Sequence, residues 1–254
     1  MKKKIVFFVF GLFVIRLAYA QSDELNELTV DRPGIAESPF TVAPGMFQFE
    51  TGFDYYKRYN GDIYFLPVSL FRTGLSKNAE LRVSVKNIQD NTSSGKLRGV
   101  SPFTIGIKTH IIEQRGWIPE TDILADIIVP LGKSDLQPSQ FGHDILLLFQ
   151  NDFSTKAAMN YNVGLVWDGF SSSSIFTSSV CFNYLPTDRI GLFIEYFDFI
   201  RKKGTEEHGI DGGMTYRIDT HVQLDISSGI SRLDNQTNFF ISTGFSIRLV
   251  TNKK

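Results

Sequence analysis

The chain has 254 residues, with 26 basic and 27 acidic side chains and a formal net charge of −1 at pH 7. This balance argues against nucleic-acid binding, which needs a basic surface. Cys181 is the only cysteine, so the sequence excludes an internal disulfide and a cysteine-rich metal site. The 23 phenylalanines and 21 glycines are compatible with a β-protein, soluble or membrane-bound.

Residues 1–20 have the pattern of a secretory signal peptide. A basic start of three lysines is followed by an apolar run over 5–15 and by the small-x-small sequence Ala18-Tyr19-Ala20. The run is too short to cross about 30 Å of hydrocarbon, and Arg16 interrupts it, which disfavours a membrane anchor. Cleavage would leave Gln21 first, which is not the cysteine of a lipoprotein, and a mature chain with 22 basic and 27 acidic residues.

Residues 21–45 are polar and contain Pro33-Gly34, Pro39 and Pro44-Gly45. These residues exclude a long helix or a central strand. We predict an N-terminal segment on the periplasmic side that leads into the first strand. Its sequence Asp31, Arg32, Pro33, Gly34 is a candidate plug for a barrel mouth, and a plain tail is the alternative.

The segment 46–56 alternates between apolar and polar side chains. Phe47 and Phe49 share one face, and Gln48 and Glu50 lie on the other. The pattern recurs in segments of about ten residues, the length that a tilted membrane-spanning strand needs. Past residue 20 no apolar run has the length of a transmembrane helix. The predicted strands are 46–56, 63–75, 79–88, 100–112, 121–131, 143–153, 159–167, 174–184, 190–200, 210–218, 222–230 and 238–249.

One predicted strand, 63–75, contains Pro67, which cannot donate a hydrogen bond to a neighbouring strand. We therefore predict a β-bulge at this position. Simple alternation places four apolar side chains on one face of this strand: Tyr64, Leu66, Val68 and Leu70.

The connections between the predicted strands alternate in length. Those after the second, sixth, eighth and tenth strands are tight, whereas polar loops are predicted at 89–99, 132–142, 201–209 and 231–237. Single-chain outer-membrane barrels have an even strand number, short periplasmic turns and longer extracellular loops. The sequence therefore predicts an all-β fold, an antiparallel up-and-down transmembrane β-barrel of about 12 strands over 46–250.

A soluble β-sandwich would give the same alternation, but the distribution of charge favours the membrane barrel. The polar faces carry small and charged residues, the other faces carry almost no charge, and aromatic residues recur near strand ends, as membrane interfaces require. The candidate lumen-lining or permeant-binding residues are Glu50, Arg72, Glu80, Arg82, Lys86, Lys108, Asp126, Asp152, Glu195, Asp211, Arg217, Asp225 and Arg248.

These inward charges have two interpretations. Rings of mixed charge select permeants, whereas a mutually neutralising network would fill the lumen. Eight strands give an interior filled by side chains and sixteen or more leave an aqueous channel, so about twelve strands predict a narrow or plugged pore.

The order of several short motifs resembles a bacterial outer-membrane family labelled with the meta-pathway of phenol degradation and often described as transporters. The resemblance implies an outer-membrane barrel and, by association, uptake of aromatic compounds. The motifs are Asp31-Arg32-Pro33-Gly34, Glu37-Ser38-Pro39, Pro44-Gly45, Glu50-Thr51-Gly52, Arg72-Thr73-Gly74-Leu75-Ser76, Glu80-Leu81-Arg82, Gly106-Ile107-Lys108, Pro130-Leu131-Gly132, Asp211-Gly212-Gly213-Met214-Thr215-Tyr216 and Gln223-Leu224-Asp225.

We predict a passive outer-membrane channel or transporter for small solutes, aromatic or hydrophobic ones among them. One alternative is a structural or adhesive barrel with a closed lumen. The other is a membrane-embedded lipid-modifying enzyme, for which Ser139, His143 and Asp144 are the only candidate catalytic group. We expect no catalysis, cofactor, metal or nucleic acid. The expected partners are outer-membrane lipid, lipopolysaccharide, the barrel-assembly machinery and a small solute.

Overall fold

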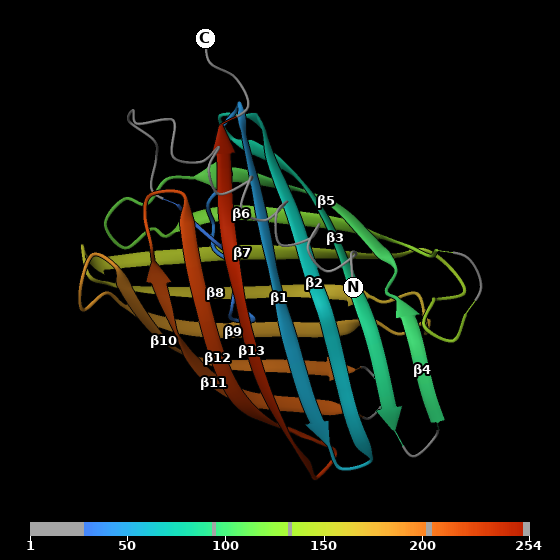
Figure 1. The fold of residues 1–254 in the computed structure, drawn as a ribbon. Helices are drawn as coiled ribbons and strands as arrows, with labels where there is room; N and C mark the ends of the chain where they lie inside the picture. The colour runs from blue at the N-terminus through green and yellow to red at the C-terminus, as the bar shows by residue number, and fades with distance from the viewer. Residues whose placement is uncertain (1–27, 93–94, 132–133, 202–204, 251–254) are drawn as a thin grey trace, which may run out of the picture.

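The computed structural model describes residues 28–92, 95–131, 134–201 and 205–250 (Figure 1). The predicted signal peptide at 1–20 and the first residues of the predicted 21–45 segment lie outside this part of the chain. The described residues form antiparallel strands wound into a barrel (Figure 1). They include no helix that is long and apolar enough to cross a membrane.

Thirteen strands make up the sheet. Their bounds are β1 (Met46–Arg58), β2 (Gly61–Ser76), β3 (Ala79–Thr92), β4 (Gly95–Val100), β5 (Phe103–Ile112), β6 (Glu120–Val129), β7 (Gly142–Ser154), β8 (Ala157–Trp167), β9 (Ile175–Tyr184), β10 (Ile190–Arg201), β11 (Glu206–Arg217), β12 (Val222–Leu233) and β13 (Gln236–Val250).

Twelve of these strands close into a ring. Each pairs antiparallel with its neighbours, β1 pairs with β13, and β2 pairs with both β1 and β3. Strand β4 lies outside the ring because it pairs only with the far end of β3, whose first half pairs with β5. The predicted 12-stranded antiparallel barrel is confirmed, with one additional strand.

The two ends of the barrel differ in their connections. The turn end, where β1 begins and β13 ends, has the short connection at Lys77-Asn78 and three other short turns, together with the longer connection 113–119. The loop end has the extended β3–β4 hairpin and the connection 130–141, and the 130–141 connection contacts β4 where Gln137 donates a hydrogen bond from Nε2 to the carbonyl of Val100, at 2.6 Å.

Three of the predicted loops are wrong in extent. The loop predicted at 89–99 is the β3–β4 hairpin, most of 201–209 belongs to β10 and β11, and 231–237 contracts to a two-residue turn at Asp234-Asn235. Both turn residues have positive φ (45° and 69°), which suits the tight hairpins that match strand twist. A polar sequence was therefore not enough to identify a loop, because the ends of several strands are polar as well.

The predicted bulge at Pro67 is confirmed. The pairing of β2 with β3 shifts register between Phe65 and Val68, and the pairing with β1 shifts opposite Phe53. The extra residue reverses the alternation, so Val68 and Leu70 pair with Gly52 and Glu50 on the lumen side. The prediction that they share a face with Tyr64 is therefore wrong, because Tyr64 packs on Tyr55 on the other side of the wall.

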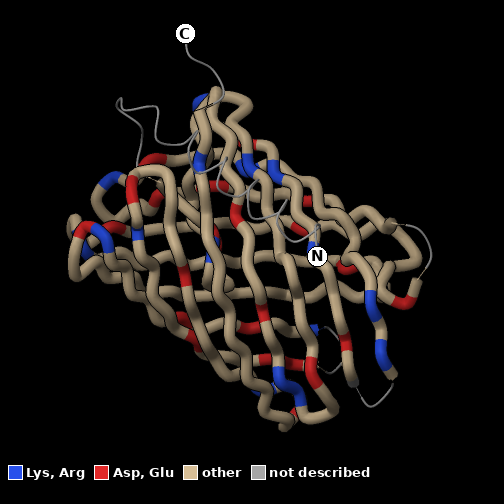
Figure 2. Tube along the Cα trace, in the orientation of Figure 1, with Lys and Arg blue, Asp and Glu red and all other residues tan. Residues whose placement is uncertain are grey.

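The wall of the barrel is apolar outside and polar inside. Many aliphatic side chains of the outer face are exposed, and among the more exposed are Ile105, Ile107, Ile127, Ile145, Leu165, Ile194, Leu224 and Ile226. Most fully buried large side chains are charged or polar instead, and charged residues lie along the strands as well as at both ends (Figure 2). This inside-out arrangement is the reverse of a soluble protein and fits a barrel whose outer face contacts lipid.

Candidate functional site: the occupied lumen

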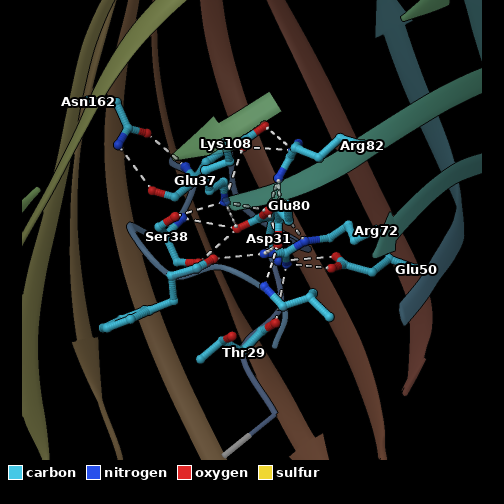
Figure 3. Close-up of polar contacts among 12 residues, drawn as sticks. Thr29, Asp31, Glu37, Ser38, Glu50, Arg72, Glu80, Arg82, Lys108 and Asn162 are labelled. Atoms are coloured by element: carbon cyan, nitrogen blue, oxygen red, sulfur yellow. Dashed lines mark hydrogen bonds and ion pairs between the residues drawn. The ribbon is translucent and has the colours of Figure 1, made fainter. Parts of the chain in front are cut away.

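Residues 28–43, here called the plug, run inside the barrel. The plug enters from the turn end, where 28–30 and 38–43 line a cavity of about 820 Å³. Its tip, Pro33-Gly34-Ile35, forms one side of a second cavity, of about 250 Å³, toward the loop end. The plug therefore lies between two cavities. Figure 3 shows polar contacts between the plug and the strands.

Asp31 of the plug is bound by three basic side chains from neighbouring strands of the wall (Figure 3). Lys108 of β5 places Nζ 2.9 Å from Oδ2 of Asp31, and Arg72 of β2 places Nη1 3.1 Å from the same oxygen. Arg82 of β3 also donates from Nη1 to Oδ2. The strands bring the three bases together because each is inward-facing and they lie at similar heights in β2, β3 and β5.

The wall supplies two carboxylates to the same cluster. Glu80 accepts a hydrogen bond from Nε of Arg72 at 2.9 Å, and Glu50 accepts one from Nη1 of Arg72 at 3.0 Å. Glu37 of the plug forms a further ion pair with Arg82, at 2.7 Å. The cluster thus combines three basic residues of the wall with two carboxylates of the wall and two of the plug.

These charges are almost entirely removed from solvent. The side chains of Arg72 and Lys108 are 0% exposed, Arg82 is 6% exposed and Asp31 is 4% exposed. Burial by itself would raise the pKa of Asp31, but the charges of Arg72, Lys108 and Arg82 outweigh it and hold that pKa well below its usual value. Removing one member of a buried network leaves its partner unpaired, which typically costs 3–5 kcal/mol.

The next plug residue, Arg32, reaches a different part of the wall. Its Nη2 lies 3.2 Å from Oδ1 of Asp225 in β12 and donates a hydrogen bond to Ser242 of β13 at 2.8 Å. Gly52 and Gly244 provide the space, because a β-carbon at Gly52 would lie 2.3 Å from Nη2 of Arg32. Asp31 and Arg32 are adjacent in sequence and are held by separate groups of strands.

The tip of the plug is held through its backbone. Glu195 of β10 accepts hydrogen bonds from the amides of Ile35 (2.7 Å) and Ala36 (2.5 Å). Asn162 of β8 accepts one from the amide of Glu37 at 2.7 Å. The wall therefore satisfies backbone donors that would otherwise be buried without partners in the lumen.

The structure distributes the predicted lumen residues in three ways. Glu50, Arg72, Glu80, Arg82, Lys108, Glu195 and Asp225 are buried and contact the plug. Asp126 and Asp211 lie directly opposite Asp144 and Glu195 in the sheet, and Arg217 and Arg248 line the turn-end cavity. Lys86 and Asp152 are exposed, with Lys86 at the loop-side cavity and Asp152 at the turn end.

Several polar lumen residues were absent from the predicted set. Asp122 is 0% exposed, and a hydrogen bond of 2.9 Å joins its Oδ1 to Nδ1 of His110. Asp144 and Asp54 also face inward. The same period-two alternation that identified Asp126 would have found these carboxylates, because they fall on the same faces of their strands.

Aromatic residues also face the lumen, in addition to the small and charged side chains expected there. Tyr56 stacks on Phe240 with ring centroids 5.4 Å apart, and Phe240 lies 6.2 Å from Phe197. The rings from β13 and β10 meet across β12 and β11 because Gly229 and Gly209 lie beneath them: a β-carbon there would approach Phe240 to 2.5 Å and Phe197 to 2.1 Å. Tyr56 and Phe240 line the loop-side cavity.

The candidate catalytic group does not assemble. His143 stacks on Trp167 with ring centroids 4.6 Å apart, whereas the neighbouring Asp144 faces Asp126 inside the barrel. Consecutive strand residues point to opposite faces, so His143 and Asp144 are separated by the wall itself.

The comparisons with known proteins agree with the barrel. A family model described as "Putative MetA-pathway of phenol degradation" matches residues 30–249. A crystal structure of an outer membrane channel from Pseudomonas putida F1 is similar, with a TM-score of 0.64 at 11% identity, covering 89% of this chain and 100% of that one. The comparison with curated protein sequences gave no match.

Two porin structures share the fold more distantly. The NanC porin has a TM-score of 0.54 at 10% identity, covering 78% of this chain and 100% of that one. The KdgM porin has a TM-score of 0.52 at 8% identity, covering 78% and 98%.

Proposed function

This chain belongs to the family described as "Putative MetA-pathway of phenol degradation", and from that membership and the barrel's geometry we propose that it is an outer-membrane channel for small solutes. The exposed aliphatic outer face supports insertion in lipid. The family description and the similar outer-membrane channel support a transport role, with aromatic and hydrophobic compounds among the solutes.

The observation that carries this proposal is the position of the plug. Cavities of about 820 Å³ and 250 Å³ lie on its two sides. Apart from its chain connection to β1 through Pro44-Gly45, the plug is held by hydrogen bonds and ion pairs. A lumen filled by wall side chains alone would have no such separable occupant. The proposed channel is therefore closed with the plug docked and conducts when the plug withdraws.

Deletion of residues 21–45 from the mature chain tests the proposal. Both proteins are refolded into planar bilayers, and heat-modifiable migration on a gel first establishes that each barrel is folded. We expect small or absent steps for the full mature chain and clear stepwise currents for the shortened one. A folded, shortened barrel with unchanged conductance would contradict the proposal and favour a structural or adhesive barrel.

A full-length variant tests the same proposal without deleting residues 21–45. Asp31→Asn combined with Arg32→Gln keeps the plug but breaks its ion pairs with Arg72, Lys108 and Asp225. We expect this variant to open more often than the unmodified chain and less often than the deletion. Lys96→Gln, in the exposed strand β4 outside the ring, is the matched control and is expected to leave conductance unchanged.

We also propose that the chain is not an enzyme. The separation of His143 and Asp144 by the wall supports this, since a nucleophile, base and orienting group must lie within hydrogen-bond reach. Lipid and lipopolysaccharide at the outer face, and the barrel-assembly machinery during insertion, are the proposed partners.

A further inference from the structure

The carboxylate at the centre of the basic cluster comes from the plug. Arg72, Arg82 and Lys108 are fixed to adjoining strands of the ring, whereas Asp31 belongs to a segment that forms no strand of the ring. The backbone amide of Ser38 also donates to Oδ1 of Asp31, at 3.1 Å, so the plug positions this carboxylate with its own backbone. The wall thus binds a carboxylate of the plug through Arg72, Arg82 and Lys108, and these three bases are called the receptor here.

The ion pairs that Lys108 makes in the described part of the chain go to the plug: its Nζ lies 2.9 Å from Asp31 and 3.7 Å from Glu37. The wall carboxylates Glu50 and Glu80 pair with Arg72, and Asp126 of the wall lines the same cavity as Arg82. The side chain of Lys108 is 0% exposed, so it loses these partners inside the barrel when the plug leaves. Buried charges must be paired, because a buried charge without a partner is strongly destabilising. Whenever Asp31 leaves, another anion is therefore favoured in its place.

The receptor opens toward the loop-side cavity. Asp31 and Arg82 line that cavity, together with Val68, Leu70 and the aromatic pair Tyr56 and Phe240. The cavity volume is about 250 Å³, and its lining also includes the acids Glu37, Asp54 and Asp126 and the bases Arg32 and Lys86. A cavity of about 150 Å³ is enough for benzene. The space thus suits a body of one ring, with an acidic group directed at the bases.

We propose that the Asp31 position is a carboxylate-binding site for a small monocarboxylic acid with an apolar body of about one ring. Asp31 is the internal competitor of that acid: it fills the site when the plug is docked, and the solute fills it when the plug moves. This inference rests on the proposed channel function and specifies one class of solute. Guanidinium and carboxylate groups match in geometry, so a neutral phenol of the same size binds less well.

Chemical rescue of Asp31→Ala tests the site without measuring transport. The full mature chain is refolded in detergent micelles, and its unfolding midpoint in urea is followed as sodium benzoate replaces sodium chloride at constant ionic strength. Because a ligand that binds only the folded state stabilises it in proportion to the logarithm of its concentration, we expect the midpoint to rise steadily with benzoate. Phenol and chloride are expected to give at most a tenth of the benzoate affinity.

Three control proteins define the site. The unmodified chain should respond weakly to benzoate because Asp31 occupies the position. Asp31→Ala combined with Lys108→Met should lose the response because one base is missing. Asp211→Ala removes a buried carboxylate whose cross-strand neighbour is the acid Glu195, so it exposes no base and should not respond.

The outcomes separate this inference from the channel proposal. Equal responses of Asp31→Ala to benzoate, phenol and chloride would overturn the carboxylate site even if deletion of the plug opens the pore. A benzoate-specific response with a silent, folded deletion variant would support the site and contradict the channel. If Asp31→Ala refolds only poorly, refolding yield becomes the measure, and equal yields with and without benzoate would overturn the inference.

Discussion

At the scale of single residues, two neighbours in the sequence hold the plug to different parts of the wall. Asp31 is bound by bases of β2, β3 and β5, and Arg32 is bound by Asp225 and Ser242 of β12 and β13. Opposite charges on adjacent residues therefore anchor one short segment to two parts of the ring. A lone charged residue would fix the plug to one side only.

The pKa of Asp31 predicts a specific dependence of stability on pH. Because its folded-state pKa is lowered, its ion pairs stabilise the protein above the unfolded pKa of about 3.9, and that contribution is lost as the pH falls through the still lower folded value. Asp31→Asn should lower the free energy of unfolding by about 3–5 kcal/mol at pH 7. This deficit should stay constant from pH 8 to pH 5 and shrink below about pH 4.

Urea unfolding of both proteins in lipid vesicles, repeated across this pH range, measures the deficit. Asp152→Asn is the matched control, since Asp152 is an exposed acid at the turn end, and it should change the free energy by less than about 0.5 kcal/mol. A deficit that already disappears between pH 8 and pH 5 would mean that Asp31 is not held as an ionised carboxylate.

Sequence periodicity predicts which face a charged residue occupies and gives no information on its partner. Alternation placed Arg72, Arg82 and Lys108 inside the barrel, as the structure has them. Their common contact with Asp31 depends on the register of three strands and on a segment up to 77 residues away in sequence. Long-range pairing of this kind leaves no local pattern in the sequence.

At the scale of elements, regular strands were predictable and departures from regularity were only partly so. The proline in β2 predicted a bulge. The face on which Val68 and Leu70 lie could not be predicted, because it depends on the register shift at that bulge. Strand β4 was not predicted because its sequence is polar. It pairs only with β3, outside the ring, and a strand in that position needs no apolar face. Alternating hydrophobicity is a signal of burial or lipid contact, and β4 has little of either.

The β12–β13 hairpin gives a prediction at this scale. Asn235 has φ of 69° and accepts a hydrogen bond from Arg232 at 2.9 Å. Asn235→Val should lower the free energy of unfolding by about 1–2 kcal/mol, because a β-branched side chain is strained in the left-handed region. Asn235→Gly should not be destabilising, since glycine adopts this conformation freely.

Thr237→Val, in the strand that follows, is the control for adding an apolar side chain to the same exposed hairpin. Urea titration of the four proteins in vesicles provides the comparison. If glycine and valine at position 235 were equally destabilising, the cost would come from the lost hydrogen bond, and backbone strain would not be its source.

At the scale of the whole molecule, lipid-facing and lumen-facing surfaces have exchanged the usual roles of surface and core. The sequence predicted this exchange because every ring strand repeats it. It did not predict how fully the plug fills the middle of the lumen, because residues 28–43 have no periodic pattern and are positioned by side chains from β1, β2, β3, β5, β8, β10, β12 and β13. The plug is therefore a property of the assembled barrel.

The orientation of the barrel in the outer membrane can be measured with single cysteines. The proposed topology places the β3–β4 hairpin outside the cell and the short turns in the periplasm. Lys96 of β4 and Lys77 of the β2–β3 turn are both exposed, so they form a matched pair. The native thiol, Cys181, is 5% exposed and is replaced by serine in both variants.

A membrane-impermeant maleimide applied to intact cells should label Lys96→Cys and leave Lys77→Cys unlabelled. Permeabilising the outer membrane should make both react, because both positions are exposed in the folded barrel. Labelling of Lys77→Cys alone in intact cells would show that the barrel has the opposite orientation, with the plug entering from outside the cell. The 250 Å³ cavity would then open to the periplasm, and the proposed carboxylate would reach its site only after crossing the membrane.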